Sequence, residues 1–182
     1  NALAHGLCYR NAQGRIQGTR INKPPLHVWR GNKGYKLTTI VYNHKERAIG
    51  FDSRVTSGRI IDTDNHMKMV VTGDKRWFFS GTEAHRNMFI ASFVEGNKCA
   101  IEFDCGAFLV EGGDVYYCSG SDGVFSKTHL TWNDAAGSGA CFAIAALDFG
   151  LSAKEAVKYA ATKDSATGGK IRVFNVTKHK FN

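Results

Sequence analysis

Residues 37–55 read LTTIVYNHKERAIGFDSRV, and this stretch decides how the rest of the sequence is interpreted. Two short apolar runs rich in β-branched residues flank the polar segment 43–47, which is the pattern of two strands joined by a turn. We therefore expect a β-hairpin here, with the acidic residue Asp52 directly after its second strand.

Similar runs, bounded by turn residues, follow along the chain. A second hairpin is predicted from strands 58–62 and 66–72, and a helix over 83–94 follows the short strand 77–79. Further strands are predicted at 100–103, 107–111, 115–119, 124–126 and 171–176, and further helices at 140–149 and 152–162. The last helix begins at a capping box formed by Ser152 and Glu155. This order of elements indicates an α+β sandwich with helices on its outer faces.

Composition supports one globular domain and excludes several other classes. The chain has 182 residues, of which 43% are hydrophobic and 22% charged, so it is not a disordered chain. Its longest apolar stretch, 140–147, is too short to cross a bilayer, and no signal-peptide pattern opens the sequence, so we expect no membrane partner. Five cysteines without a CxxC pair argue against a disulfide scaffold and a zinc site. We expect a cytoplasmic protein with reduced thiols and no cofactor.

Charge is distributed unevenly along the chain. Residues 1–36 hold seven Lys or Arg and no Asp or Glu, whereas the remainder holds seventeen basic and sixteen acidic residues. The sequence therefore predicts a basic leader or arm, 1–37, ahead of a nearly neutral domain, 38–182. Such an arm can bind nucleic acid through counterion release, bind an acidic protein surface, or pack on its own domain or a neighbouring subunit.

Seven segments in order resemble the proteasome β-subunit family and its bacterial relatives, which are threonine peptidases of the N-terminal-nucleophile (Ntn) hydrolase class. Single segments carry little weight, but their common order and spacing over most of residues 38–176 carry a great deal. The resemblance implies an Ntn-hydrolase-type sandwich of antiparallel β-sheets flanked by helices. The matching segments are TTIV (38–41), FDSRVTSG (51–58), MKM (67–69), SGTEA (80–84), AGSGA (136–140), GLSAKEAV (150–157) and KDSATGGKIRV (163–173).

The family's chemistry explains which residue types recur in these segments. A threonine hydroxyl attacks an amide bond while its own free α-amine acts as base, and a lysine paired with an aspartate lies beside it. The resemblance implies that Thr38 is the nucleophile and that Asp52 and Lys68 form the pair. The interval from Thr38 to Asp52 is two residues shorter than is usual. A loss of two preserves the facing of side chains on a strand and so favours Thr38 over Thr39.

The remaining site residues come from later segments. The resemblance implies that Ser138, Asp164 and Thr167 support the amine, although the family usually has serine at the last position. It also implies that Thr56 lines the substrate strand and that the backbone NH of Gly81 is the oxyanion donor. Taken singly, these residues have simpler interpretations: Asp52 and Lys68 as a structural ion pair, or Ser138 as a helix cap.

Three features depart from the family pattern. Thr38 is internal, so residues 1–37 must be removed before its amine is free. Leu37 stands where self-processing members usually have glycine. Only one helix is predicted between Lys68 and Ser138, where the family normally has two, and His85 occupies a position that is often acidic. We therefore expect a reduced helix set.

Three functions remain open at this stage. The first is a proteasome-like threonine peptidase, made as a precursor, that hydrolyses a polypeptide substrate. The second is a catalytically silent subunit of a homo-oligomer or a larger assembly, such as a viral particle, in which the arm clamps a neighbour. The third is a nucleic-acid-binding module that acts through residues 1–36.

Overall fold

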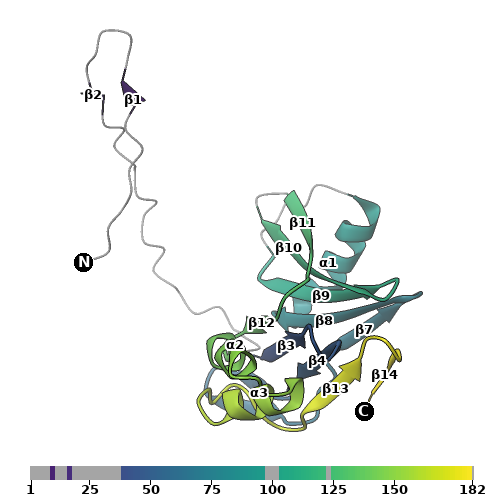
Figure 1. Ribbon diagram of the computed structural model, residues 1–182. Helices are drawn as coiled ribbons and strands as arrows, with labels where there is room; N and C mark the ends of the chain where they lie inside the picture. Colours follow the sequence, from purple (N-terminus) through teal and green to yellow (C-terminus); the bar gives the residue numbers. More distant parts are fainter. Residues whose placement is uncertain (1–8, 11–15, 18–37, 97–102, 122–123, 182) are drawn as a thin grey trace. The chain divides into compact units, whose positions relative to one another are not determined.

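The computed structural model describes residues 9–10, 16–17, 38–96, 103–121 and 124–181 (Figure 1). The chain divides into two compact units, residues 1–32 and 33–182. In the first unit, strand β1 (Tyr9–Arg10) pairs antiparallel with β2 (Ile16–Gln17). The rest of the predicted basic arm, and most of the strand predicted at 100–103, lie outside the described residues.

Two five-stranded sheets form the second unit, and every described strand pair in them is antiparallel. The first sheet has the order β12-β3-β4-β13-β14 and the second has the order β11-β10-β9-β8-β7. The strands of the first sheet are β3 (Thr39–Asn43), β4 (Ala48–Phe51), β12 (Asp134–Gly137), β13 (Arg172–Asn175) and β14 (Lys180–Phe181). Those of the second are β7 (Met69–Thr72), β8 (Lys75–Gly81), β9 (Cys105–Glu111), β10 (Asp114–Ser121) and β11 (Val124–His129).

The two sheets face each other across an aromatic core. Phe51 from the first sheet lies 5.4 Å, centroid to centroid, from Phe78 of the second, and Phe78 lies equally far from Phe174. All three are fully or almost fully buried, and Phe108 joins them from β9. Burial of such large rings contributes several kcal/mol in total, at roughly 25 cal/mol per Å² of apolar area, and fixes how the sheets pack.

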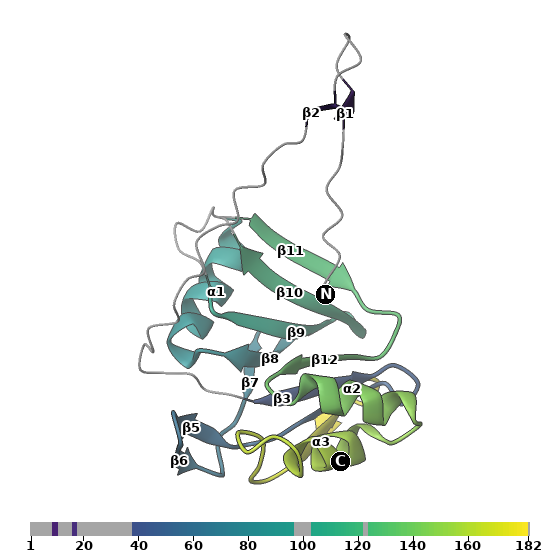
Figure 2. The same cartoon turned by 90° about the vertical axis from the view of Figure 1, so that its left-hand side faces the viewer.

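Helices cover both outer faces and complete a four-layer arrangement (Figure 2). Helices α2 (Ala140–Asp148) and α3 (Ala153–Ala161) pack on the first sheet through small side chains. Helix α1 (Glu83–Glu95) packs on the second sheet through aromatic ones, with Phe89 fully buried. The predicted capping box is confirmed, since Ser152 and Glu155 exchange both of its hydrogen bonds.

The predicted sandwich of antiparallel sheets and helices is confirmed, and so is a single helix between Lys68 and Ser138 within the described residues. The predicted second hairpin is wrong. Strand β6 (Ile60–Thr63) pairs with β5 (Val55–Ser57), and β7 pairs with β8. The chain bends at Asp64, whose carbonyl and carboxylate are bound by Ser53 and Arg54, and this bend separates β6 from β7. The short strands β12 and β14 were not predicted.

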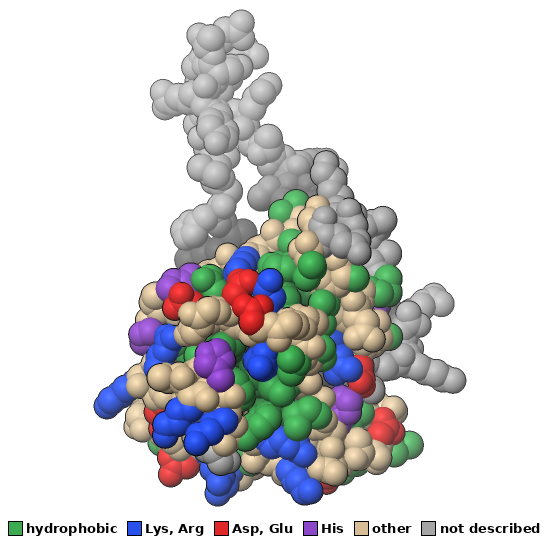
Figure 3. Space-filling view, turned by 90° about the vertical axis from the view of Figure 1, so that its right-hand side faces the viewer, with side chains coloured by type: hydrophobic (Ala, Val, Ile, Leu, Met, Phe, Trp, Pro, Cys, Tyr) green, Lys and Arg blue, Asp and Glu red, His purple; other side chains and the backbone are tan. Residues whose placement is uncertain are grey.

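The surface of the second unit carries charges of both signs. Figure 3 shows one face on which Lys and Arg side chains alternate with Asp and Glu, and hydrophobic side chains lie between them. This mixture agrees with the nearly neutral sequence of residues 38–182. Within the described part of the chain, no helix is long and apolar enough to span a membrane.

Candidate active site

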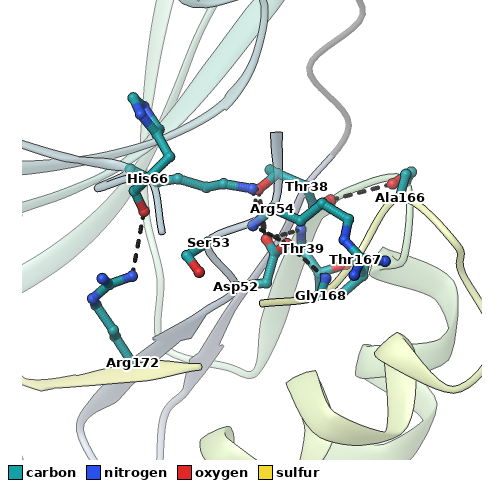
Figure 4. A network of polar contacts seen from close by, with 12 residues as sticks. Thr38, Thr39, Asp52, Ser53, Arg54, His66, Ala166, Thr167, Gly168 and Arg172 are labelled. Atoms are coloured by element: carbon teal, nitrogen blue, oxygen red, sulfur yellow. Dashed lines mark hydrogen bonds and ion pairs between the residues drawn. The ribbon is translucent and has the colours of Figure 1, made fainter. Parts of the chain in front are cut away.

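Thr38 lies immediately before β3 and is almost completely buried. Its hydroxyl Oγ1 donates a hydrogen bond of 2.7 Å to Asp52 Oδ1. The ammonium of Lys68 approaches the same hydroxyl and lies 2.7 Å from Asp52 Oδ1. The three residues that the resemblance implied as nucleophile and pair therefore meet at one point, from segments 14 and 30 residues apart in sequence (Figure 4).

The carboxylate of Asp52 is fully buried and accepts hydrogen bonds on both oxygens. Besides Thr38 and Lys68, three backbone amides donate to it: those of Thr39 at 3.0 Å, Arg54 at 3.1 Å and Gly168 at 2.9 Å. Removing an ionised carboxylate from water costs several kcal/mol unless its lone pairs are occupied. These five donors satisfy the lone pairs of the buried carboxylate, and one of them is the ammonium of the buried Lys68.

A second carboxylate, that of Asp164, lies in the loop between α3 and β13. Its Oδ2 accepts from Ser138 Oγ at 2.5 Å and from Thr167 Oγ1 at 2.6 Å. Ser138 Oγ also lies 3.5 Å from the carbonyl oxygen of Thr38, which is a weak hydrogen bond. Ser138 does not cap a helix, because the N-cap of α2 is Gly139.

Thr38 and Thr39 point in different directions, as neighbours on a strand do. The hydroxyl of Thr39 lies 2.6 Å from that of Thr167, on the side of the second carboxylate. A Cβ at Gly139 would approach Thr39 Oγ1 to 2.2 Å, so this position requires glycine. Of the two threonines, Thr38 is the one that touches Lys68.

A pocket opens beside Thr38 between the end of β8 and the start of α1. Gly81 lies on its wall with φ of +96°, and a Cβ there would come within 2.3 Å of the Asp104 carbonyl oxygen. Thr56 lies outside this pocket; its buried Oγ1 has no hydrogen-bond partner among the described residues. The pocket is lined by Thr38, Val55, His66, Lys68, Phe79, Gly81, Thr82, Glu83 and Arg86.

One wall of this pocket is charged, and sequence reasoning missed it. Glu83 Oε1 lies 3.3 Å from His66 Nε2 and 3.2 Å from Arg86 Nη2. The spacing of Glu83 and Arg86 by three residues on a predicted helix was the one available signal. Val55 and Phe79 add apolar side chains to the lining.

The described residues include no cluster of metal-ligating side chains, and two of their cysteines are buried or half-buried thiols. No group of three or more His, Cys, Asp or Glu side chains among them is arranged to hold an ion. Burial raises the pKa of both Cys105 and Cys118 to about 12, so these thiols remain protonated at neutral pH. The groups that the structure brings together at the site are a hydroxyl, an ammonium and two carboxylates.

Solved structures share this fold, although no family model and no curated protein matches the chain. One is Thiobacillus denitrificans BPH in complex with epoxomicin, at 15% identity and a TM-score of 0.58. Another is the eukaryotic HslV of Trypanosoma brucei, at 19% identity and a TM-score of 0.59. Each alignment covers 75% of this chain and 97% of the other. The proteasome-like fold that the sequence predicted is thereby supported; at these identities the likeness concerns the fold alone.

Proposed function

We propose that the chain is a proteasome-like threonine peptidase whose nucleophile is the hydroxyl of Thr38. The observation that carries this proposal is the contact of Thr38 Oγ1 with both Asp52 and Lys68 at the base of a pocket. Removing two charges from water can cost more than their attraction returns, so a buried ion pair is weak evidence for a stabilising role. Buried ionisable pairs beside a pocket are candidates for functional sites.

The proposed reaction is hydrolysis of an amide bond through an acyl-threonine intermediate. Thr38 Oγ1 attacks the substrate carbonyl and its proton passes to the freed α-amine, which acts as the base. The leaving amine then takes this proton. Water next attacks the ester, and the same groups handle the proton in the second step. Asp52 keeps the charge of Lys68 compensated throughout, and Asp164 with Ser138 and Thr167 orients the amine.

Two further residues are proposed to contact the substrate. The backbone NH of Gly81, on the pocket wall, would stabilise the oxyanion that forms during the attack. The buried hydroxyl of Thr56 has no partner in the described part of the chain, which is costly in a folded protein. A substrate backbone laid against β5 would satisfy it.

The α-amine of Thr38 is joined to Leu37 in this sequence, so the proposal requires cleavage between residues 37 and 38. Thr38 Oγ1 could itself attack the carbonyl of Leu37, after which hydrolysis of the ester releases residues 1–37 and frees the amine. Leu37 is bulkier than the glycine that favours such a turn, so we expect this step to be slow unless a second protease performs it.

The test compares three proteins: the full chain, a chain released from a fusion partner so that it begins at Thr38, and the same released chain with Thr38→Ala. Release of a fluorophore from peptide amides measures activity, and intact mass after incubation with epoxomicin, the compound bound to the BPH neighbour, measures reaction at Thr38. The proposal expects activity and a mapped adduct in the second protein alone. Equal reactivity of the Thr38→Ala protein would contradict it.

A second candidate is a silent subunit of an oligomer whose arm contacts a neighbour or a nucleic acid. The observation that favours this candidate is that residues 1–36 contain Lys and Arg but no Asp or Glu. Sedimentation of the full chain and of a chain lacking 1–36 tests assembly, and an unchanged oligomeric state would contradict the arm's role. Binding to nucleic acid should weaken steeply with salt, and substituting the arm's arginines should flatten that slope.

A further inference from the structure

Arg54 connects three segments of the active-site region. It lies in the segment 51–58 that carries part of the family resemblance, but no role was predicted for its side chain. Its Nε and Nη2 donate to the two carboxylate oxygens of Asp64, at 2.8 and 3.2 Å. Its Nη1 donates to the backbone carbonyl of Ser165 at 2.9 Å. One planar guanidinium thus holds the bend after β6 and the loop between α3 and β13 at the same time.

The backbone of Arg54 reinforces this connection. Its amide donates both to Asp52 Oδ2, at 3.1 Å, and to the carbonyl of Gly168, at 3.0 Å. The amide of Gly168 donates a hydrogen bond of 2.9 Å to the same Asp52 Oδ2. The segment that carries Asp52 and the loop that carries Asp164 are therefore joined by the backbone and side chain of one residue.

Two glycines make room for this arrangement. A Cβ at Gly168 would lie 2.5 Å from Arg54 Cζ, so the guanidinium packs directly on the backbone there. Gly169 has φ of +70°, and a Cβ would come within 2.4 Å of the Asp64 carbonyl oxygen. Next to it, the amide of Lys170 donates to Ser53 Oγ at 2.7 Å. Glycine is thus required at 169, where the backbone of Asp64 approaches, whereas a side chain at 168 would displace the Arg54 guanidinium.

We propose that Arg54 is a positioning residue that sets the distance between the two carboxylates of the site. The loop from 162 to 170 forms no strand pairing, so side-chain and backbone hydrogen bonds hold it near Thr38. Its contacts with the segment 52–54 add to those that Thr167 makes with Thr39 and that Asp164 makes with Ser138. Arg54 touches neither Thr38 nor the pocket beside it. The proposed effect of Arg54 on activity rests on the proposed peptidase function, whereas the proposed effect of Arg54 on the loop does not.

Hydrogen exchange on the full chain tests the effect on the loop, with no requirement for activity. In an Arg54→Gln variant, the amides of Gly168 and Lys170 should exchange about 10- to 100-fold faster, because charge-assisted hydrogen bonds to the loop are lost. The matched control is Arg47→Gln, which removes a guanidinium bound to Tyr42 Oη and the Gly113 carbonyl at another turn. The control should leave exchange at 168 and 170 unchanged. Unchanged exchange in Arg54→Gln, or an equal change in both variants, would overturn the proposal.

Kinetics on the chain that begins at Thr38 then test the consequence for the reaction. A misplaced loop should lower kcat about 10- to 100-fold and change KM less than threefold, since the pocket is intact. Arg54→Lys should have a kcat similar to that of Arg54→Gln, because an ammonium cannot bond to Asp64 and Ser165 together. Full activity in Arg54→Lys or Arg54→Gln would overturn the positioning role. If the unsubstituted protein is itself unreactive, the peptidase proposal fails while the exchange result still decides the role of Arg54.

Discussion

Two carboxylates flank Thr38, and the protein holds them in opposite ways. Asp52 follows a strand of the first sheet, is fully buried, and receives three of its five hydrogen bonds from backbone amides. Asp164 lies in a loop, is partly exposed, and is bound by the hydroxyls of Ser138 and Thr167 and the amide of Ala166. Backbone amides fix the position of Asp52, whereas the position of Asp164 depends on the contacts that hold its loop.

In the proposed peptidase, this difference would separate two tasks of the site. A charge that must stay fixed beside an ammonium is best held by backbone amides, which cannot rotate away. A group that passes protons at the surface needs side-chain hydroxyls, which reorient easily. The contrast predicts that substitutions at the two positions have different effects on stability and on rate.

The largest difference is expected in stability. Asp52→Ala removes the carboxylate that Lys68 and three backbone amides bind, and should lower the free energy of unfolding by about 3–5 kcal/mol. Asp164→Ala should cost about 1 kcal/mol or less, because the loop is partly exposed, yet lower peptide hydrolysis about 10- to 100-fold. Chemical denaturation of both variants measures the first effect. Equal losses of stability would remove the distinction between the two carboxylates.

A smaller structural effect but a large kinetic one is expected at Lys68. In Lys68→Met, Asp52 keeps its bonds to Thr38 and to three backbone amides, so the protein should remain folded. Activity of the chain that begins at Thr38 should fall about a thousandfold, since the ammonium beside the nucleophile is lost. Lys75→Met, which removes a surface pair with Glu111, serves as the matched control and should leave the rate unchanged. A Lys68→Met protein that retains normal turnover would show that the pair is structural.

The smallest effect is expected away from the site, at the capping box of α3. The hydrogen bond from Ser152 lowers the pKa of Glu155, so this contribution is present above the unfolded pKa of glutamate and is lost as the pH falls through the folded value. Ser152→Ala should cost about 1 kcal/mol at neutral pH. Thermal unfolding at several pH values should show that the two proteins differ less in unfolding temperature below about pH 4.3, the usual pKa of glutamate. A difference independent of pH would mean that Glu155 does not contribute.

Much of the architecture could be predicted because local patterns and tertiary packing agree. The hairpin of β3 and β4, helix α1 and the capping box all follow from short-range sequence. The wrong hairpin shows the limit of such patterns: residues 58–62 can pair with the strand on either side. What decides between them is the bend at Asp64, which depends on Ser53 and Arg54. Strand β12 was missed because its Ala and Gly residues have low strand propensity and it pairs through backbone alone.

The candidate site was predictable only through the resemblance. No local pattern links Thr38 to Lys68, and the loop of Asp164 and Thr167 comes more than 100 residues later in the chain. Arg54 escaped notice because one partner, Ser165, is 111 residues away and the bond is to a backbone carbonyl. The charged lining of the pocket was not predicted, because His66 has no distinctive sequence spacing from Glu83. Contacts of this kind become visible only once the chain is folded.

The most direct test of the central claim is the N-terminal sequence and intact mass of the protein isolated in active form. If Thr38 is the nucleophile and its amine must be free, the active species should begin at Thr38. Epoxomicin should then add to that residue. An active preparation in which Leu37 is still joined to Thr38 would contradict the account, and the search for function would move to the basic arm.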